Sequence, residues 1–261
     1  GGVFCVKNWI SRLRGKDTER CLWEGDDIRY GFGLPDGPIA ERGLVEGFLP
    51  IITASWVRSG VSYSQTALVM PLLGVPPAGG RIWADDTLVL RSRIVMRMQG
   101  AAPATGSLSF AVSDGKGGQK LSLDGDLIVG TFGDKKVPRM LVSSPDGVAL
   151  SEKEGVVTAA VPLLAESPSR TLDVAIPFVT LTEGKEWELI RTVPFEEALK
   201  KVRDYWRSRV WSGTQIVTPE PMINDYYKAH VAHLLINTER EVGVSDRYMA
   251  KVGTFHYGVY A

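Results

Sequence analysis

The sequence is poor in cysteine, has only three histidines and carries no excess of charge of either sign. Its two cysteines, Cys5 and Cys21, could form one disulfide with each other, but they are too few to define a disulfide scaffold. No Cys-x-x-Cys occurs, so neither a zinc ribbon nor a thioredoxin-type site is predicted. We therefore predict no cofactor and no metal site.

Charge and hydropathy exclude further classes of function. Thirty basic residues balance thirty acidic ones, so no overall field favours nucleic acid or an anionic membrane, and we expect binding to neither. No apolar run reaches the roughly 20 residues that span a bilayer. Gly1 to Ile10 lack the charged start and apolar middle of a signal peptide, although a signal removed upstream is left open. With 261 residues, the chain can form a large domain and a smaller appendage.

Strands are predicted throughout the first two thirds of the chain. The clearest covers residues 86–100, where apolar and polar side chains alternate as on a half-buried strand. Its predicted inward side chains are Leu88, Leu90, Ile94, Met96 and Met98. Further candidate strands lie at residues 60–73, 106–114, 119–132, 155–164 and 170–181. Together they predict a mainly β fold, a large antiparallel β-sandwich over residues 1–192.

Two details of this sandwich can be predicted from glycine and proline. The segment 114–118, DGKGG, predicts the turn of a hairpin into residues 119–132, because glycine tolerates positive φ. It lacks the Gly-Lys-Ser/Thr ending of a phosphate loop. In residues 170–181 we expect Leu172, Val174, Ile176 and Phe178 to face inward, and Pro177 to mark an edge or a bulge.

Helical spacing begins after Thr192. A linker helix is predicted in residues 193–217, because one apolar stripe at spacings of four, three and four runs through Phe195, Leu199, Val202 and Trp206. A second helix is predicted to open the region 218–261, with Thr218 as its cap and Gly243 as its end. Two appended helices cannot cover two apolar stripes by themselves, so we expect them to need partner helices.

The order of these segments resembles the N-terminal part of glycosidases of the six-hairpin, (α/α)6-toroid type, which include glucoamylase-like and disaccharide-phosphorylase-like enzymes. In these enzymes a large β-sandwich precedes a toroid of twelve helices that carries the active site. The resemblance rests on four stretches: IRYGFGLPDGP at 28–38, SYSQTALVMPLL at 62–73, FEEALKKVRDYWRSR at 195–209 and TPEPMINDYYKAHVAHLLINT at 218–238. It implies a truncated chain, comprising a supersandwich-like domain, a linker helix and the incomplete start of a toroid.

The resemblance also implies a function and partners. The parent protein is expected to be a glycoside hydrolase acting on oligo- or polysaccharide, and the chain alone is expected to be inactive. Its expected partners are carbohydrate and either the remainder of the helical toroid domain or a neighbouring chain. Two alternatives stay open: a non-catalytic carbohydrate-binding or structural module, which an exposed row of aromatics on one sheet would indicate, and a phosphorylase-like enzyme, which would need a phosphate site.

No catalytic residue is assigned within the chain. Hydrolysis of a glycosidic bond needs two carboxyl groups, and in the toroid relatives both lie beyond the second toroid helix. The adjacent pairs Asp26–Asp27 and Asp85–Asp86 do not qualify, because neighbouring residues on a strand point to opposite faces and those in turns are usually solvated.

A sugar contact is predicted near the last residues, KVGTFHYGVYA. The resemblance places this stretch at the approach to the second toroid helix, where many relatives carry an aromatic followed by an Arg-Asp pair that binds sugar hydroxyls. The Arg-Asp pair is missing here, so that contact is not carried over. We predict instead that His256 or Tyr257 lines the sugar pocket, with simple packing as the alternative.

Two other groups of residues have a functional and a structural interpretation. His230 and His233 could share a helix face as metal ligands, but a place in a core or an interface is favoured because no further ligand completes a set. A carbohydrate platform could be formed by Trp9, Trp23, Trp56 and Trp83. Their positions in separate segments favour a role as core anchors.

Overall fold

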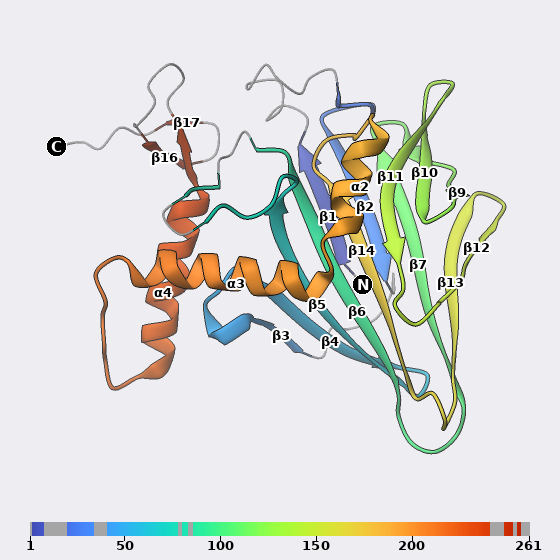
Figure 1. Ribbon diagram of the computed structural model, residues 1–261, viewed down its shortest axis with the longest axis horizontal. Helices are drawn as coiled ribbons and strands as arrows, with labels where there is room; N and C mark the ends of the chain where they lie inside the picture. The colour runs from blue at the N-terminus through green and yellow to red at the C-terminus, as the bar shows by residue number, and fades with distance from the viewer. Residues whose placement is uncertain are drawn as a thin grey trace.

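The computed structural model describes residues 2–7, 20–33, 41–77, 80–82, 86–240, 248–252 and 255–256. Two large antiparallel sheets pack face to face, and three helices follow them in the chain (Figure 1). The predicted fold class, a mainly β sandwich followed by helices, is therefore confirmed.

The first sheet has six strands. Its order is β1 (Gly2–Lys7), β2 (Asp27–Gly33), β7 (Ala104–Asp114), β13 (Val156–Leu163) and β12 (Leu150–Lys153), and the short β8 (Gly117–Gly118) also pairs with β7. The turn between β7 and β8 is the one predicted at residues 114–118: the Asp114 carboxylate accepts a hydrogen bond from the Lys116 N–H at 2.9 Å, and Gly117 has a φ of 108°. The predicted pairing with residues 119–132 was wrong: the hairpin ends after two residues of β8, and the chain then crosses to the other sheet, where residues 122–124 and 127–132 form strands.

The second sheet has eight strands. Its order is β3 (Glu41–Leu44), β4 (Ile52–Arg58), β5 (Val61–Pro71), β6 (Leu88–Met98), β14 (Ser169–Pro177), β11 (Lys135–Ser143), β10 (Leu127–Phe132) and β9 (Ser122–Asp124). A separate small sheet consists of β15 (Thr238–Arg240), β16 (Tyr248–Val252) and β17 (Phe255–His256).

The main core lies between the two large sheets and follows the predicted alternation. On β6, Leu90, Ile94 and Met96 are buried in it, and on β14 Leu172, Val174 and Ile176 are. Pro177 differs from its prediction: it is the last residue of a strand inside the sheet, without an irregularity in its pairing to β6. It is tolerated there because the pairing of β14 with β11 has already ended at Ala175.

The helix α2 (Gly184–Thr192) falls inside the segment that was predicted to belong to the sandwich domain. A capping box between Glu183 and Glu186 starts it. Trp187 and Ile190 bury its inner side in a second, smaller core formed with the outer face of the eight-stranded sheet. The sequence did not predict this helix, because its nine residues are too few to show apolar side chains recurring with a helical period.

The predicted linker helix is present as α3 (Phe195–Trp211). Its stripe faces the eight-stranded sheet as expected: Phe195 and Val202 are buried, and Leu199 and Trp206 are partly buried. They pack with Phe48, Leu49, Ile51, Leu68 and Met70, which come from β5 and from the segment around the 3-10 helix η2 (Val45–Gly47). The prediction of a helix packed on the sandwich is thus confirmed.

The second predicted helix is α4 (Pro221–Ile236), and both of its predicted ends were wrong. Thr218 is not the cap: it lies before the helix, where its N–H donates to the Asn224 side-chain oxygen at 2.8 Å. The helix stops at Ile236 because the chain enters β15 two residues later, and Gly243 lies outside the described residues. Among the described residues, no helix is long and apolar enough to cross a bilayer.

Candidate functional site

The predicted sugar-contacting residues can be placed only in part. His256 belongs to β17, where its backbone pairs with Lys251 of β16. Its side chain and the whole of Tyr257 lie outside the described residues. The sugar contact at these two residues therefore stays a prediction.

Two of the four tryptophans of the possible platform are core residues. Trp23 and Trp56 expose 4% and 3% of their surface and lie between the two large sheets. Trp56 stacks on Tyr63, with ring centroids 5.6 Å apart and planes within 2° of parallel. Their place in the core agrees with the favoured interpretation, and Trp9 and Trp83 lie outside the described residues.

The acidic pair Asp26–Asp27 has no catalytic geometry. The Asp27 carboxylate accepts hydrogen bonds from the Arg29 guanidinium at 3.3 Å and from the Cys5 thiol at 3.4 Å, while Asp26 is exposed. Cys5 is exposed and Cys21 is buried, and although both are among the described residues they form no disulfide with each other. Asp85 lies outside the described residues, so the second pair cannot be compared.

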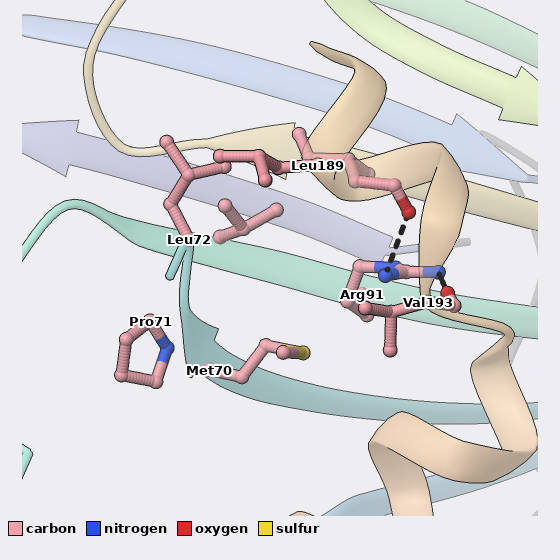
Figure 2. Close-up of a pocket in the computed structure, with 8 residues that line it drawn as sticks. Met70, Pro71, Leu72, Arg91, Leu189 and Val193 are labelled. Carbon is pink, nitrogen blue, oxygen red and sulfur yellow. Dashed lines mark hydrogen bonds between the residues drawn. The ribbon is translucent and has the colours of Figure 1, made fainter. Parts of the chain in front are cut away.

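A small hollow lies between α2 and the eight-stranded sheet (Figure 2). It holds about 10 Å³, no more room than one water molecule needs. Its lining residues are Met70, Pro71, Leu72, Val89, Arg91, Leu189, Ile190 and Val193. The Arg91 guanidinium donates to the carbonyl oxygens of Ile190 at 3.4 Å and Val193 at 3.0 Å, so its donors serve to hold the α2–α3 corner. Burial lowers the pKa of Arg91. We interpret the hollow as a packing defect.

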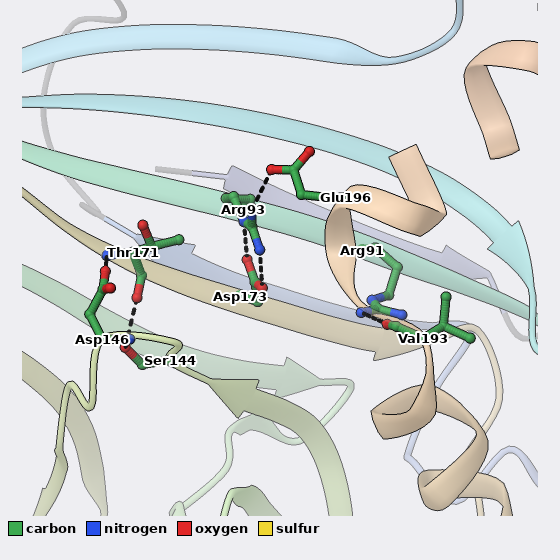
Figure 3. Close-up of polar contacts among 8 residues, drawn as sticks. All are labelled: Arg91, Arg93, Ser144, Asp146, Thr171, Asp173, Val193 and Glu196. Carbon is green, nitrogen blue, oxygen red and sulfur yellow. Dashed lines mark hydrogen bonds and ion pairs between the residues drawn. The ribbon is translucent and has the colours of Figure 1, made fainter. Parts of the chain in front are cut away.

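A charged cluster on the same outer face joins β6, β14 and α3 (Figure 3). Arg93 binds both carboxylate oxygens of Asp173 at 2.7 Å, and its third bond, at 2.5 Å, goes to Glu196 in the first turn of α3. The guanidinium also lies 4.7 Å above the ring of Phe195. The hydrogen bonds to Asp173 raise the pKa of Arg93. Because Arg93 binds both carboxylates, the cluster joins α3 to the sheet, and we interpret it as structural.

A second buried arginine lies at the edge of the main core. Arg139 is 1% exposed and donates to Thr180, Gln119 and the backbone oxygen of Leu22. Burial lowers its pKa, and burial raises the pKa of the neighbouring Tyr30 to about 12. These hydrogen bonds join three separate segments of the chain, so we interpret this cluster too as structural.

The inner side of α4 is held by polar and small residues. Ala232 is its only buried side chain. Lys228 lies over the rings of Phe48 at 4.8 Å and Trp211 at 4.9 Å, and its ammonium group is 3.6 Å from the Asp225 carboxylate. Cation–π contacts of this kind contribute about 0.5 to 2 kcal/mol each. The helix is therefore attached through few contacts.

The outward face of α4 is an exposed surface that the contacts described so far do not explain. With 3.6 residues per turn, six side chains fall within about 120° of the helix circumference: Met222, Ile223, Tyr226, His230, His233 and Leu234. We call this set the outward face. It contains no Asp, Glu, Lys or Arg. The four apolar members are 47% to 81% exposed, whereas a solvent-facing helix surface normally carries charges.

Three rings of the outward face form a row along the helix. Tyr226 stacks on His230 with centroids 6.2 Å apart, and His230 stacks on His233 at 6.4 Å. Both histidines are exposed, so they do not lie in a core. A place in an interface, the other half of the favoured interpretation, stays open. Among the described residues, no group of three or more His, Cys, Asp and Glu could hold a metal ion. The row is thus a flat aromatic surface suited to stacking.

Sequence reasoning missed the buried charges but had a signal for them. The alternation in the sequence places Arg91 and Arg93 on the polar face of β6. It does not indicate that α2 and α3 cover that face. The outward face of α4 had a clearer signal, since the expected helix was short of charge along one side.

Neither a protein-family model nor a curated protein matches this chain.

Proposed function

We propose that this chain is the N-terminal part of a carbohydrate-active enzyme, a glycoside hydrolase acting on oligo- or polysaccharide. In this proposal the sandwich and α3 support an α-helical domain of the (α/α)6-toroid type whose first helix is α4. The parent enzyme needs two carboxyl groups for hydrolysis, and we place both outside residues 1–261, so the chain alone is inactive.

One observation carries the proposal: α4 has an uncharged, exposed outward face, while α3 and the inner side of α4 pack in one cluster on the sandwich. Figure 1 shows α4 crossing the far end of α3, at the side of the molecule opposite the six-stranded sheet. An apolar helix face of this kind is normally buried against further helices. A helical domain, or a neighbouring chain, that packs against α4 would bury it.

The alternative of a non-catalytic carbohydrate-binding module receives less support. It requires a row of exposed aromatic side chains on one sheet, because such modules hold sugar rings by stacking. Among the described residues the large aromatic side chains that are most exposed are Trp211 and Tyr226, and both belong to helices. Phosphorolysis, the other alternative, would require a phosphate site.

The first experiment measures hydrolysis. Release of reducing ends from a panel of α- and β-linked oligosaccharides is measured for the full-length gene product and for residues 1–261. We expect turnover by the full-length protein only. Turnover by residues 1–261 would contradict the placement of the carboxyl groups, and no turnover by either would contradict the enzyme assignment.

The second experiment tests the predicted sugar contact in the full-length protein. Tyr257→Ala is expected to lower kcat/KM by about tenfold, since a stacking contact worth about 1.4 kcal/mol in the transition state has that effect. The control is the thermal midpoint of the variant, which should equal that of the parent. Unchanged kinetics, or a variant that does not fold, would show that Tyr257 serves packing.

A further inference from the structure

We infer that the Asp124–Gly125 peptide is a site of spontaneous covalent modification, at which the folded chain rearranges through a cyclic succinimide to isoaspartate. The chain has four Asp-Gly pairs, and the structure describes three of them, at 114–115, 124–125 and 146–147. The fold leaves the reacting groups of the second pair free and holds those of the other two. The inference does not depend on the proposed function.

The rearrangement needs only water and the two residues themselves. In the first step the backbone nitrogen of Gly125 attacks Cγ of Asp124, its proton and the carboxyl hydroxyl leave as water, and a five-membered imide ring closes. Water then opens the ring: attack at Cγ restores aspartate, and attack at the main-chain carbonyl carbon leaves the peptide running through Cγ, which is isoaspartate. Glycine favours the first step, because it has no side chain to obstruct the ring and its backbone rotates freely.

The reacting groups at 124–125 are free. Asp124 is the last residue of β9 and pairs with Leu127, so Gly125 and Asp126 form a two-residue turn. Asp124 and Gly125 are exposed, and among the described residues neither the Asp124 carboxylate nor the Gly125 N–H has a hydrogen-bond partner. A side-chain carbon built on Gly125 would meet no atom within 4 Å, so the ring has room to form. The strand β9 has three residues and lies at the end of the strand order of its sheet, so it opens readily.

The pair Asp114–Gly115 is held on both sides. The Asp114 carboxylate accepts hydrogen bonds from the N–H groups of Lys116 at 2.9 Å and Glu24 at 3.3 Å. A third bond comes from the side-chain amide of Gln119 at 2.8 Å. The Gly115 N–H donates to the carbonyl oxygen of Glu24 at 2.8 Å, and the same oxygen would lie 3.1 Å from a side-chain carbon built on Gly115. Ring closure would therefore break several bonds in a crowded place.

The pair Asp146–Gly147 shows that exposure alone does not decide. Asp146 is exposed, as Asp124 is, but its carboxylate accepts a hydrogen bond from the Thr171 N–H at 2.6 Å. The Gly147 N–H donates to the carbonyl oxygen of Ser144 at 3.3 Å. Breaking one hydrogen bond to a charged group slows a reaction by about tenfold or more, so this pair should react more slowly than 124–125.

The test compares the three pairs within one molecule. The protein of residues 1–261 is incubated for several weeks at body temperature and about pH 5, where some carboxyl groups are still protonated. Isoaspartate is then measured in each peptide by chromatographic separation of peptides of equal mass and by labelling with an isoaspartate-specific methyltransferase. We expect it to form at 124–125 at least about tenfold faster than at 114–115 or 146–147. Equal rates at the three pairs, or a faster rate at either of the others, would overturn the inference.

The same incubation in concentrated guanidinium chloride tests whether the fold makes the difference. The three pairs consist of the same two residue types, so once unfolding has removed their hydrogen bonds they should react at similar rates. A site at 114–115 or 146–147 that stays slow in the unfolded chain would show that the fold does not protect it.

A substitution identifies the reacting carboxyl group. Asp124→Glu should abolish isoaspartate formation at this turn, because glutamate would have to close a larger ring, and the exposed side chain has no hydrogen bond to lose. The matched control is Asp134→Glu, which changes an exposed aspartate in the next turn that is followed by lysine, and it should leave the product at 124–125 unchanged. Persistence of the product in Asp124→Glu would place the modified residue elsewhere.

The modification should loosen the end of the sheet. Isoaspartate adds one carbon to the main chain at Asp124, so Ser122 and Leu123 can no longer keep their register with Val129 and Ile128. Hydrogen exchange of residues 122–124 should therefore be faster in the modified protein, purified by chromatography, than in the unmodified protein. Equal exchange in the two forms would contradict this consequence.

Discussion

Replacement of Arg93 by methionine tests how α3 is positioned on the sandwich. Methionine keeps the apolar stem that packs near Phe195 and removes the guanidinium, so Asp173 loses both of its 2.7 Å bonds. The Asp173 side chain is only 11% exposed. A buried carboxylate without its partner is costly, and loss of one member of such a pair typically destabilises a protein by about 3 to 5 kcal/mol.

The exposed arm of the same cluster supplies the matched control. Glu196 is 72% exposed, and surface ion pairs contribute about 1 kcal/mol or less, so Glu196→Gln should have a small effect. The double variant Arg93→Met, Asp173→Asn removes both charges of this ion pair. It should therefore be more stable than Arg93→Met alone, by about 2 kcal/mol.

Equilibrium unfolding in urea, followed by tryptophan fluorescence, measures these differences in the free energy of unfolding. The order expected is wild type, Glu196→Gln, double variant and Arg93→Met, from most to least stable. If Arg93→Met costs no more than Glu196→Gln, or if the double variant is the least stable of all, the argument from an uncompensated buried carboxylate is wrong.

Four further substitutions have defined outcomes. Phe195→Ala should lower the free energy of unfolding by about 3 to 5 kcal/mol, because the ring is 2% exposed. Trp206→Ala should cost less, because its side chain is only partly buried, and equal costs in urea unfolding would contradict this. Between pH 10 and about 12 the unfolded chain ionises Tyr30 while the folded chain keeps its proton, so stability should fall by about 2.5 kcal/mol. Tyr30→Phe should remove that part of the alkaline loss measured by thermal melting. Lys228→Met should speed hydrogen exchange of α4 about fivefold, as loss of about 1 kcal/mol implies, and unchanged exchange would show that the cation is not what holds the helix.

The β-sandwich could be predicted because its information is local. Alternating side chains such as Leu90, Ile94 and Met96 have one period in the sequence and one face in the sheet, so their burial follows from the pattern. The stripe of α3 was predictable for the same reason, since Phe195 and Val202 recur with the period of a helix. In both cases the sequence determined which side of an element becomes buried.

Other features depended on which elements meet in space. Arg91 and Arg93 lie on the polar side of β6, and the alternation alone would leave them in water. They are covered because α2 and α3, about a hundred residues later, fold back over that face, where backbone oxygens and Asp173 satisfy the guanidinium groups. Nothing in a local period records such a contact, since it depends on long-range packing.

The α4 region shows both sides of this division. The sequence determined that a helix forms there and that one side of it, from Met222 to Leu234, carries no Asp, Glu, Lys or Arg. Only the tertiary structure decided that this side faces outward, because Lys228, held between Phe48 and Trp211, turns the opposite side toward the sandwich. The orientation of a helix is set by the surface it rests on, and that surface comes from distant parts of the chain.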